Sequence, residues 1–220
     1  MFNEKYQKGI FTIILLATNV LLFLFFDMIY GTGGIRWFAD HFGLTVSGIL
    51  QDGEYYRFIT STFVHFHIAH LANNMLLLGI LGYNLEQEKG HLKFLTIYVV
   101  SGLGGNLLSF VTRNYFNETL TPLNDPFNRL YNLLVEITSD PNVVSGGASG
   151  AVFGLMGAVL GIYLKTKRPV GRLAGRSLVV MIAISLFLGL TDYGIDNAAH
   201  IGGLIFGFLI ALLLPDRRVS

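Results

Sequence analysis

The chain has 220 residues, of which 52% are hydrophobic and 13% are charged, and its mean hydropathy is +0.57. Because soluble domains carry about 25% charged residues, this composition indicates an integral membrane protein. The net charge of +1 argues against a nucleic-acid-binding protein, and the absence of cysteine excludes disulfides, thiolate catalysis and zinc–thiolate sites.

Six apolar stretches are long enough to cross a bilayer as helices, which takes about 20 residues for ~30 Å of hydrocarbon. They cover residues 10–30, 67–84, 92–111, 148–164, 177–193 and 198–214. The first is too long for the apolar core of a signal peptide and lacks a clear small-residue cleavage site, so we interpret it as the first span. We therefore predict an all-α membrane protein, a six-transmembrane-helix bundle over residues 10–214 with a long first outer loop.

Basic residues are distributed unevenly between the two sides of this bundle. Most of the 15 Lys and Arg residues, above all those of the loop 165–176, fall on the same side as residues 1–9. The positive-inside rule places that side in the cytoplasm. Residues 1–9 and 215–220 are then expected to be short cytoplasmic tails.

Two loops on the outer side are long. Residues 31–66 are rich in aromatic residues and glycine, and such a loop can lie in the membrane interface as an aromatic belt. Residues 112–146 are more polar, and the stretch Phe127 to Ile137 within them is a candidate short helix. Nothing in either loop marks a second, soluble domain.

The second, fourth and sixth spans all run from outside to inside, so their first residues share one depth. The polar residues at these ends are His65, His67, His70, Asn74, Ser149 and His200. Polar groups inside a bilayer are rare and tend to be functional. The topology therefore predicts a functional layer near the outer face.

Small residues form a stripe on each of the last two helices of this layer. The stripes consist of Gly147, Gly150, Gly154, Gly157 and Gly161 in the fourth span and of Gly203, Gly207 and Ala211 in the sixth. Close packing of transmembrane helices explains such stripes by itself. If the two stripes face each other, Ser149 and His200 meet at the outer end, where a histidine can activate a serine hydroxyl as nucleophile.

Other polar residues allow alternatives around this pair. Asp196 lies one turn before His200 and could orient its ring as the third member of a triad, although a solvated position in a short loop is the simpler interpretation. His70 and Asn74 share one helix face and could donate to a developing oxyanion. Asn73, about 100° away on the helical wheel, is the alternative donor.

The remaining charged and metal-type residues have simpler interpretations. The histidines at 65, 67 and 70 have no carboxylate or cysteine near them in the spans, so a catalytic metal site is not expected. Arg57 is interpreted as a structural anchor in the first outer loop. A solvated turn with local ion pairs is the simplest interpretation of the charged residues at the inner end of the second and third spans, which are Glu86, Glu88, Lys89 and Lys93.

Together these residues resemble the rhomboid family of intramembrane serine proteases, from about Glu54 to Leu214. Four pieces carry the resemblance: Tyr56-Arg57, His65-x4-His70-x3-Asn74, Gly147-Ala148-Ser149-Gly150 with Phe153, Gly154 and Gly157, and Ala199-His200-x2-Gly203-x3-Gly207. The loop 112–146 is a departure, because it is longer than a compact rhomboid needs.

The resemblance implies a Ser149–His200 dyad that requires no acid. It implies that the oxyanion is held by backbone at Ser149 and its neighbours Gly147 and Ala148, together with the side chains of His70 and Asn74. It further implies supporting roles, namely stacking of Phe153 on His200, tying of inner helix ends by Glu86, packing by Gly203 and Gly207, and placement of the first loop and second helix by Arg57 and His65. The span 177–193 and the loop 191–197 would act as gate and cap.

The expected function is therefore that of an intramembrane serine endopeptidase that cleaves transmembrane segments of membrane proteins near the outer face. Its expected partners are transmembrane substrates and the lipid bilayer, with no cofactor, metal or nucleic acid, and its expected location is the bacterial inner membrane. Two alternatives come from other classes: an inactive rhomboid-like protein that binds membrane clients, and a small transporter, which would need polar groups nearer the midplane.

Overall fold

The computed structural model of the chain describes residues 9–117, 143–171, 173, 175–191 and 195–215. The residues 1–8 and 216–220 of the two expected tails, the candidate helix at 127–137 and residues 192–194 of the expected cap lie outside the described residues. Within the described ranges the fold is helical, and the only bridges between extended residues are Leu44 with Ser145 and Val170 with Leu173.

Six long helices match the six apolar stretches, so the all-helical prediction is confirmed. They are α1 (Ile10–Tyr30), α5 (Ile68–Lys89), α6 (His91–Asn117), α8 (Ser149–Thr166), α9 (Gly175–Thr191) and α10 (Asn197–Leu213). The predicted ends of the second and third spans are too early, because both helices continue past their apolar part into charged or polar residues. The His67 side chain caps the start of α5 by accepting from the His70 N–H, and Gly90 ends it at φ +87°.

Length and apolar composition single out part of this set as able to cross a membrane. Among the described helices, α1, α6 over His91–Asn114 and α8 meet both criteria, and α5 joins them if the bent pair Arg57–Phe63 and Ile68–Lys89 is one broken span. The helix α10 and the Leu178–Phe187 part of α9 are apolar but shorter. The count of six spans therefore stays a prediction.

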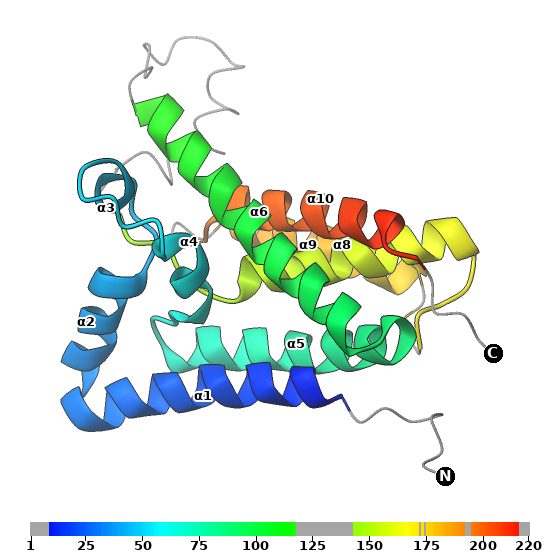
Figure 1. Cartoon of the computed structure of the whole chain (residues 1–220), viewed down its shortest axis with the longest axis horizontal. Helices are drawn as coiled ribbons and strands as arrows, with labels where there is room; N and C mark the ends of the chain where they lie inside the picture. Colours follow the sequence, from blue (N-terminus) through cyan, green and yellow to red (C-terminus); the bar gives the residue numbers. More distant parts are fainter. Residues whose placement is uncertain (1–8, 118–142, 172, 174, 192–194, 216–220) are drawn as a thin grey trace.

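The helix α8 lies at the centre of the bundle, with 67% of its residues buried. It contacts α5, α6, α9 and α10, and α1 lies along α5 at the edge (Figure 1). The two glycine stripes face each other, since a Cβ on Gly203 would lie 1.9 Å from the Gly150 carbonyl oxygen and one on Gly207 would lie 2.0 Å from that of Gly154. Glycine therefore allows α8 and α10 to pack backbone to backbone.

Near the C-terminal end of α5, Glu86 is fully buried and joins three helices. Its carboxylate accepts from the N–H groups of Phe11 (3.0 Å) and Thr12 (2.9 Å) and from the Thr12 hydroxyl (2.7 Å), and it pairs with His91 on α6. The first N–H groups of a helix have no intrahelical partner, so the carboxylate satisfies the start of α1. The solvated-turn interpretation is wrong for Glu86 and for Lys89, which is 2% exposed.

The loop that was expected on the outer side, residues 31–66, contains four short helices: α2 (Thr32–Phe42), α3 (Val46–Leu50), α4 (Arg57–Thr60) and the 3-10 helix Ser61–Phe63. Arg57 is buried among them and donates from Nη1 to the Gly43 carbonyl (2.6 Å) and from Nε to Glu54 (2.5 Å). Hydrogen bonds from Arg57 and Tyr56 hold the pKa of the Glu54 carboxyl below its usual value. Arg57 therefore fastens the start of α4 to the end of α2, as an anchor does.

Candidate functional site

Ser149 is the first residue of α8, and the turn before it can be made only by glycine. Gly147 has φ +132°, and a Cβ on it would lie 2.7 Å from both Cε1 and Nε2 of His70. The Gly147 N–H donates to the Ser61 carbonyl (2.8 Å), and the Ala148 N–H approaches Nε2 of His65 at 3.5 Å. These two N–H groups are already engaged, whereas the Ser149 N–H belongs to the start of α8, where helix N–H groups have no intrahelical partner, and so it can serve as a backbone donor.

His200 lies in the first turn of α10, on the side that faces α8. Its ring stacks on Phe153, with 4.1 Å between ring centroids and 10° between planes, and Phe153 is one helical turn after Ser149. The ring is 7% exposed, and its Nδ1 has no hydrogen-bond partner among the described residues. The Ser149 hydroxyl and the His200 ring thus share one end of the α8–α10 interface without a hydrogen bond between them in the described part of the chain. Such bonds are often long before substrate binds.

His70 and Asn74 lie beside the serine turn on the neighbouring α5. The same Cβ on Gly147 that would meet the His70 ring would lie 3.6 Å from Nδ2 of Asn74. Asn74 is 3% exposed, and its Nδ2 has no hydrogen-bond partner among the residues described. Asn73 is exposed, whereas Asn74 is buried beside the turn, which favours Asn74 over Asn73 as the donor. Two side-chain donors therefore gather next to the Ser149 backbone.

His65 packs between the serine turn and His70. It is 2% exposed, and its ring centroid lies 5.0 Å from that of His70, whose ring is also stacked with that of Phe66. The neighbouring His67 is occupied as the cap of α5. The histidines of this segment thus have packing and capping partners within the protein.

Asp196 has a position that the sequence did not predict. Its carboxylate accepts from the hydroxyls of Ser109 (2.5 Å) and Ser145 (2.7 Å), from Arg113 (3.0 Å) and from the Ala199 N–H (3.0 Å). Neither earlier interpretation holds: the carboxylate makes no bond to the His200 ring, and its side chain is only 12% exposed rather than solvated. Burial acts to raise the pKa of Asp196, but the Arg113 guanidinium and these hydrogen bonds outweigh it and hold the pKa below its usual value.

This cluster connects the two segments that carry the candidate dyad. Ser145 precedes Ser149 by four residues, and Ala199 directly precedes His200. Sequence reasoning missed Ser109, Arg113 and Ser145 as contributors. The signal that could have found them was Arg113, a cation near the C-terminal end of an apolar helix, which needs a buried partner of opposite charge.

Comparison with known proteins agrees with the geometry, because the rhomboid domain matches residues 52–217 of this chain. The chain belongs to the rhomboid family. Rhomboid protease GluP of Bacillus subtilis (strain 168) is 32% identical over 207 residues, which cover 94% of this rhomboid and 35% of GluP. Rhomboid protease AarA of Providencia stuartii is 32% identical over 189 residues, which cover 80% of this chain and 63% of AarA.

The similarity extends to plants. RHOMBOID-like protein 5 of Arabidopsis thaliana is 33% identical over 171 residues, which cover 77% of this rhomboid and 47% of the plant protein. This rhomboid thus spans about a third of GluP and about half of the plant relative. The family and the apolar helices make it a multi-pass membrane protein.

Proposed function

We propose that this rhomboid is an intramembrane serine endopeptidase with Ser149 as nucleophile and His200 as general base. One observation carries the proposal, which is that three helices bring three kinds of group together. They are a serine at a helix N-terminus, a buried histidine that stacks on a phenylalanine one turn after that serine, and two side-chain hydrogen-bond donors. Nucleophile, base and oxyanion donors are the parts that acyl transfer needs.

In the proposed reaction, His200 takes the Ser149 proton as Oγ attacks the carbonyl carbon of the scissile peptide bond. The Ser149 N–H and the side chains of His70 and Asn74 donate to the oxyanion that forms. His200 then gives its proton to the leaving amine, and water hydrolyses the acyl-enzyme. The Nδ2 of Asn74 has no hydrogen-bond partner within the described ranges, and this supports its role, because a buried donor of this kind gains a hydrogen bond when the oxyanion appears.

The proposed substrates are transmembrane helices of other membrane proteins, cut near their outer ends in the bacterial inner membrane. Peptide bonds within a helix are shielded, so a substrate with helix-breaking Gly or Pro near the cut should be preferred. The glycine-lined turn at residues 146–147 favours a small residue just before the cut.

The test is labelling of the purified protein in detergent with a serine-directed fluorophosphonate, followed by peptide mapping. We expect the probe on Ser149 and cleavage of a reporter whose transmembrane segment carries a Gly-Pro pair near its outer end. Labelling at another serine, or cleavage that the probe does not inhibit, would overturn the assignment. Binding of such segments without any cleavage would favour the client-binding alternative instead.

Replacing Asn74 by Ala is expected to lower kcat by about 10²–10³-fold, the usual cost of losing one oxyanion donor. The matched control is Asn73→Ala, since Asn73 is the adjacent amide but is exposed. Initial rates of reporter cleavage over a range of substrate densities in liposomes separate kcat from KM. Equal rates for the two variants would remove Asn74 from the proposed mechanism.

A further inference from the structure

The two carboxylate oxygens of Asp196 bind two different parts of the fold. Oδ1 accepts from the Ala199 N–H (3.0 Å) and so caps the start of α10, while the main-chain carbonyl of Asp196 accepts from the His200 N–H (3.2 Å). The cap satisfies an N–H group that has no partner within the helix. The first turn of α10, which carries His200, is therefore bound to Asp196 through both side chain and backbone.

The second oxygen, Oδ2, binds α6 and residues 143–148, which lead into α8 and are called here the serine segment. It accepts from Ser109 Oγ (2.5 Å) and Arg113 Nη2 (3.0 Å) of α6 and from Ser145 Oγ (2.7 Å) of the serine segment. Arg113 also donates from Nη1 to the Val143 carbonyl (2.9 Å), which binds α6 to the serine segment a second time. The carboxylate of Asp196 is thus the point where α6, the serine segment and α10 meet.

The serine segment has further attachments that do not involve Asp196. Ser145 exchanges two backbone hydrogen bonds with Leu44 (2.7 and 2.9 Å), and the Gly147 N–H donates to the Ser61 carbonyl (2.8 Å). Ser149 follows Gly147 by two residues, so these bonds fix the serine turn to residues 44–61. The first turn of α10 depends on Asp196 instead. The carboxylate therefore sets where His200 lies relative to a serine turn that is already held.

This position needs a carboxylate, because four donors converge on its two oxygens. An asparagine offers one oxygen, so its NH₂ group would face either Arg113 or the Ala199 N–H, which are donors themselves. Arg113, whose side chain is 4% exposed, would also lose its buried counter-charge. Asparagine at position 196 would consequently release either the cap of α10 or the bonds to α6 and the serine segment.

We infer that Asp196 is a positioning residue: it fixes the first turn of α10 against the serine segment and thereby sets the approach of the His200 ring to the Ser149 hydroxyl. This role in catalysis rests on the proposed function of Ser149 and His200, whereas the positioning itself does not. Reaction rates depend steeply on such placement, since a displacement of about 1 Å can cost about 10²-fold in rate.

Asp196→Asn is expected to lower kcat for reporter cleavage by about 10²-fold and to leave KM within about twofold, because it displaces the reacting groups and removes no contact with substrate. The matched control is Asp40→Asn, the same change at an exposed aspartate of α2, which should cleave like the wild type. Ser145→Ala keeps the Asp196–Arg113 pair and is expected to lower kcat by about tenfold, through the loss of one hydrogen bond to a charged group. Wild-type kcat in both Asp196→Asn and Ser145→Ala would overturn the inference.

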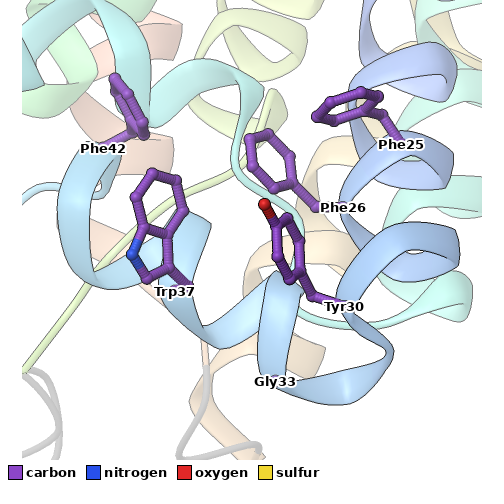
Figure 2. Close-up of a pocket in the computed structure, with 6 residues that line it drawn as sticks. All are labelled: Phe25, Phe26, Tyr30, Gly33, Trp37 and Phe42. Carbon is purple, nitrogen blue, oxygen red and sulfur yellow. The ribbon is translucent and has the colours of Figure 1, made fainter.

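The single tryptophan of the chain reports whether each variant is folded. Figure 2 shows Trp37 of α2 on one side of an aromatic cluster and Phe26 and Tyr30 of α1 on the other, and the Trp37 ring stacks on that of Phe26 with 5.8 Å between centroids. This cluster shares no residue with the bonds of Asp196. Values of kcat are compared between variants whose tryptophan emission and Tm show a folded protein, and Ser145→Ala decides the question if Asp196→Asn does not fold.

A cysteine pair tests the positioning without any cleavage. The chain has no cysteine, and a Cβ on Gly150 would lie 3.8 Å from the Cβ of Ala199, which is the usual separation in a disulfide. In the Gly150→Cys/Ala199→Cys protein, treated with copper phenanthroline and analysed by peptide mapping, Asp196→Asn is expected to slow disulfide formation by at least about tenfold, because a disulfide needs this separation. Asp40→Asn should leave the rate unchanged.

The two experiments separate the positioning from the proposed function. Equal rates of disulfide formation with and without Asp196→Asn in folded protein would overturn the inference. A disulfide rate that depends on Asp196, in a chain whose wild type cleaves no reporter, would keep the positioning and overturn the proposed function alone.

Discussion

Replacing Ser149 by Ala is expected to lower the rate of reporter cleavage by more than about 10³-fold, because no nucleophile then remains to form the acyl-enzyme. His200→Ala is expected to have a similar effect, since its ring is the base within one turn of the serine. Residues that act as one unit are not additive, so the double variant should be no slower than either single one. Cleavage rates in liposomes measure the complete reaction, and fluorophosphonate labelling measures the reactivity of the nucleophile alone.

The control for this prediction is Ser101→Ala on α6. Ser101 is a buried serine, whereas Ser149 is half-buried, and the Ser101 hydroxyl has no hydrogen-bond partner among the described residues. It therefore offers the same side chain in another helix, α6. The Ser101→Ala variant should cleave the reporter, and be labelled by the probe, like the wild type. If Ser149→Ala retained wild-type cleavage while Ser101→Ala lost it, the nucleophile would be assigned to the wrong helix.

Gly207→Ala is expected to produce a large loss of stability. The new Cβ would lie 2.0 Å from the Gly154 carbonyl oxygen, and the neighbouring atoms are also backbone of α8, so no side chain can move aside. Overpacking a well-packed interface costs about 1–3 kcal/mol, and a backbone clash lies at or above the upper end. Thermal unfolding in detergent measures the change as a lower Tm.

Gly79→Ala on α5 is the matched control. Its Cβ would meet only Cδ1 of Leu16, at 3.9 Å, which is an ordinary contact. Alanine favours a helix over glycine by about 1 kcal/mol, so this variant should unfold at the same temperature as the wild type or higher. A Gly207→Ala protein as stable as Gly79→Ala would show that α8 and α10 are not in backbone contact.

Sequence reasoning predicted those features that depend on a repeating pattern. The six apolar stretches became helices because a bilayer-length apolar run has few other folds available to it. The facing stripes of α8 and α10 followed from glycine spacing, and they brought Phe153 and His200 together at one end. The same logic placed His70 and Asn74 on one face of α5, and the close approach of Gly147 put both beside Ser149.

The features that sequence reasoning missed depend on partners far away in the chain. From its charged sequence neighbours Glu86 was interpreted as solvated, and only the family resemblance implied that it ties helix ends together. Its hydrogen-bond donors come from the start of α1, 74 and 75 residues away. Asp196 was misjudged for the same reason, because its partners Ser109 and Arg113 lie on another helix. Helix α2 was also not predicted, since the two glycines at 33 and 34 lower helix propensity near its start.

The bonds of Asp196 have a practical consequence. They fasten the serine-bearing and histidine-bearing segments through Ser145 and Ala199, and none of them uses the Ser149 hydroxyl or the His200 ring. The positions of these two segments therefore do not depend on the side chains that are proposed to perform the reaction. A chain without the Ser149 hydroxyl keeps every one of these bonds, which makes it suitable as a trap that holds an uncut client for isolation and identification.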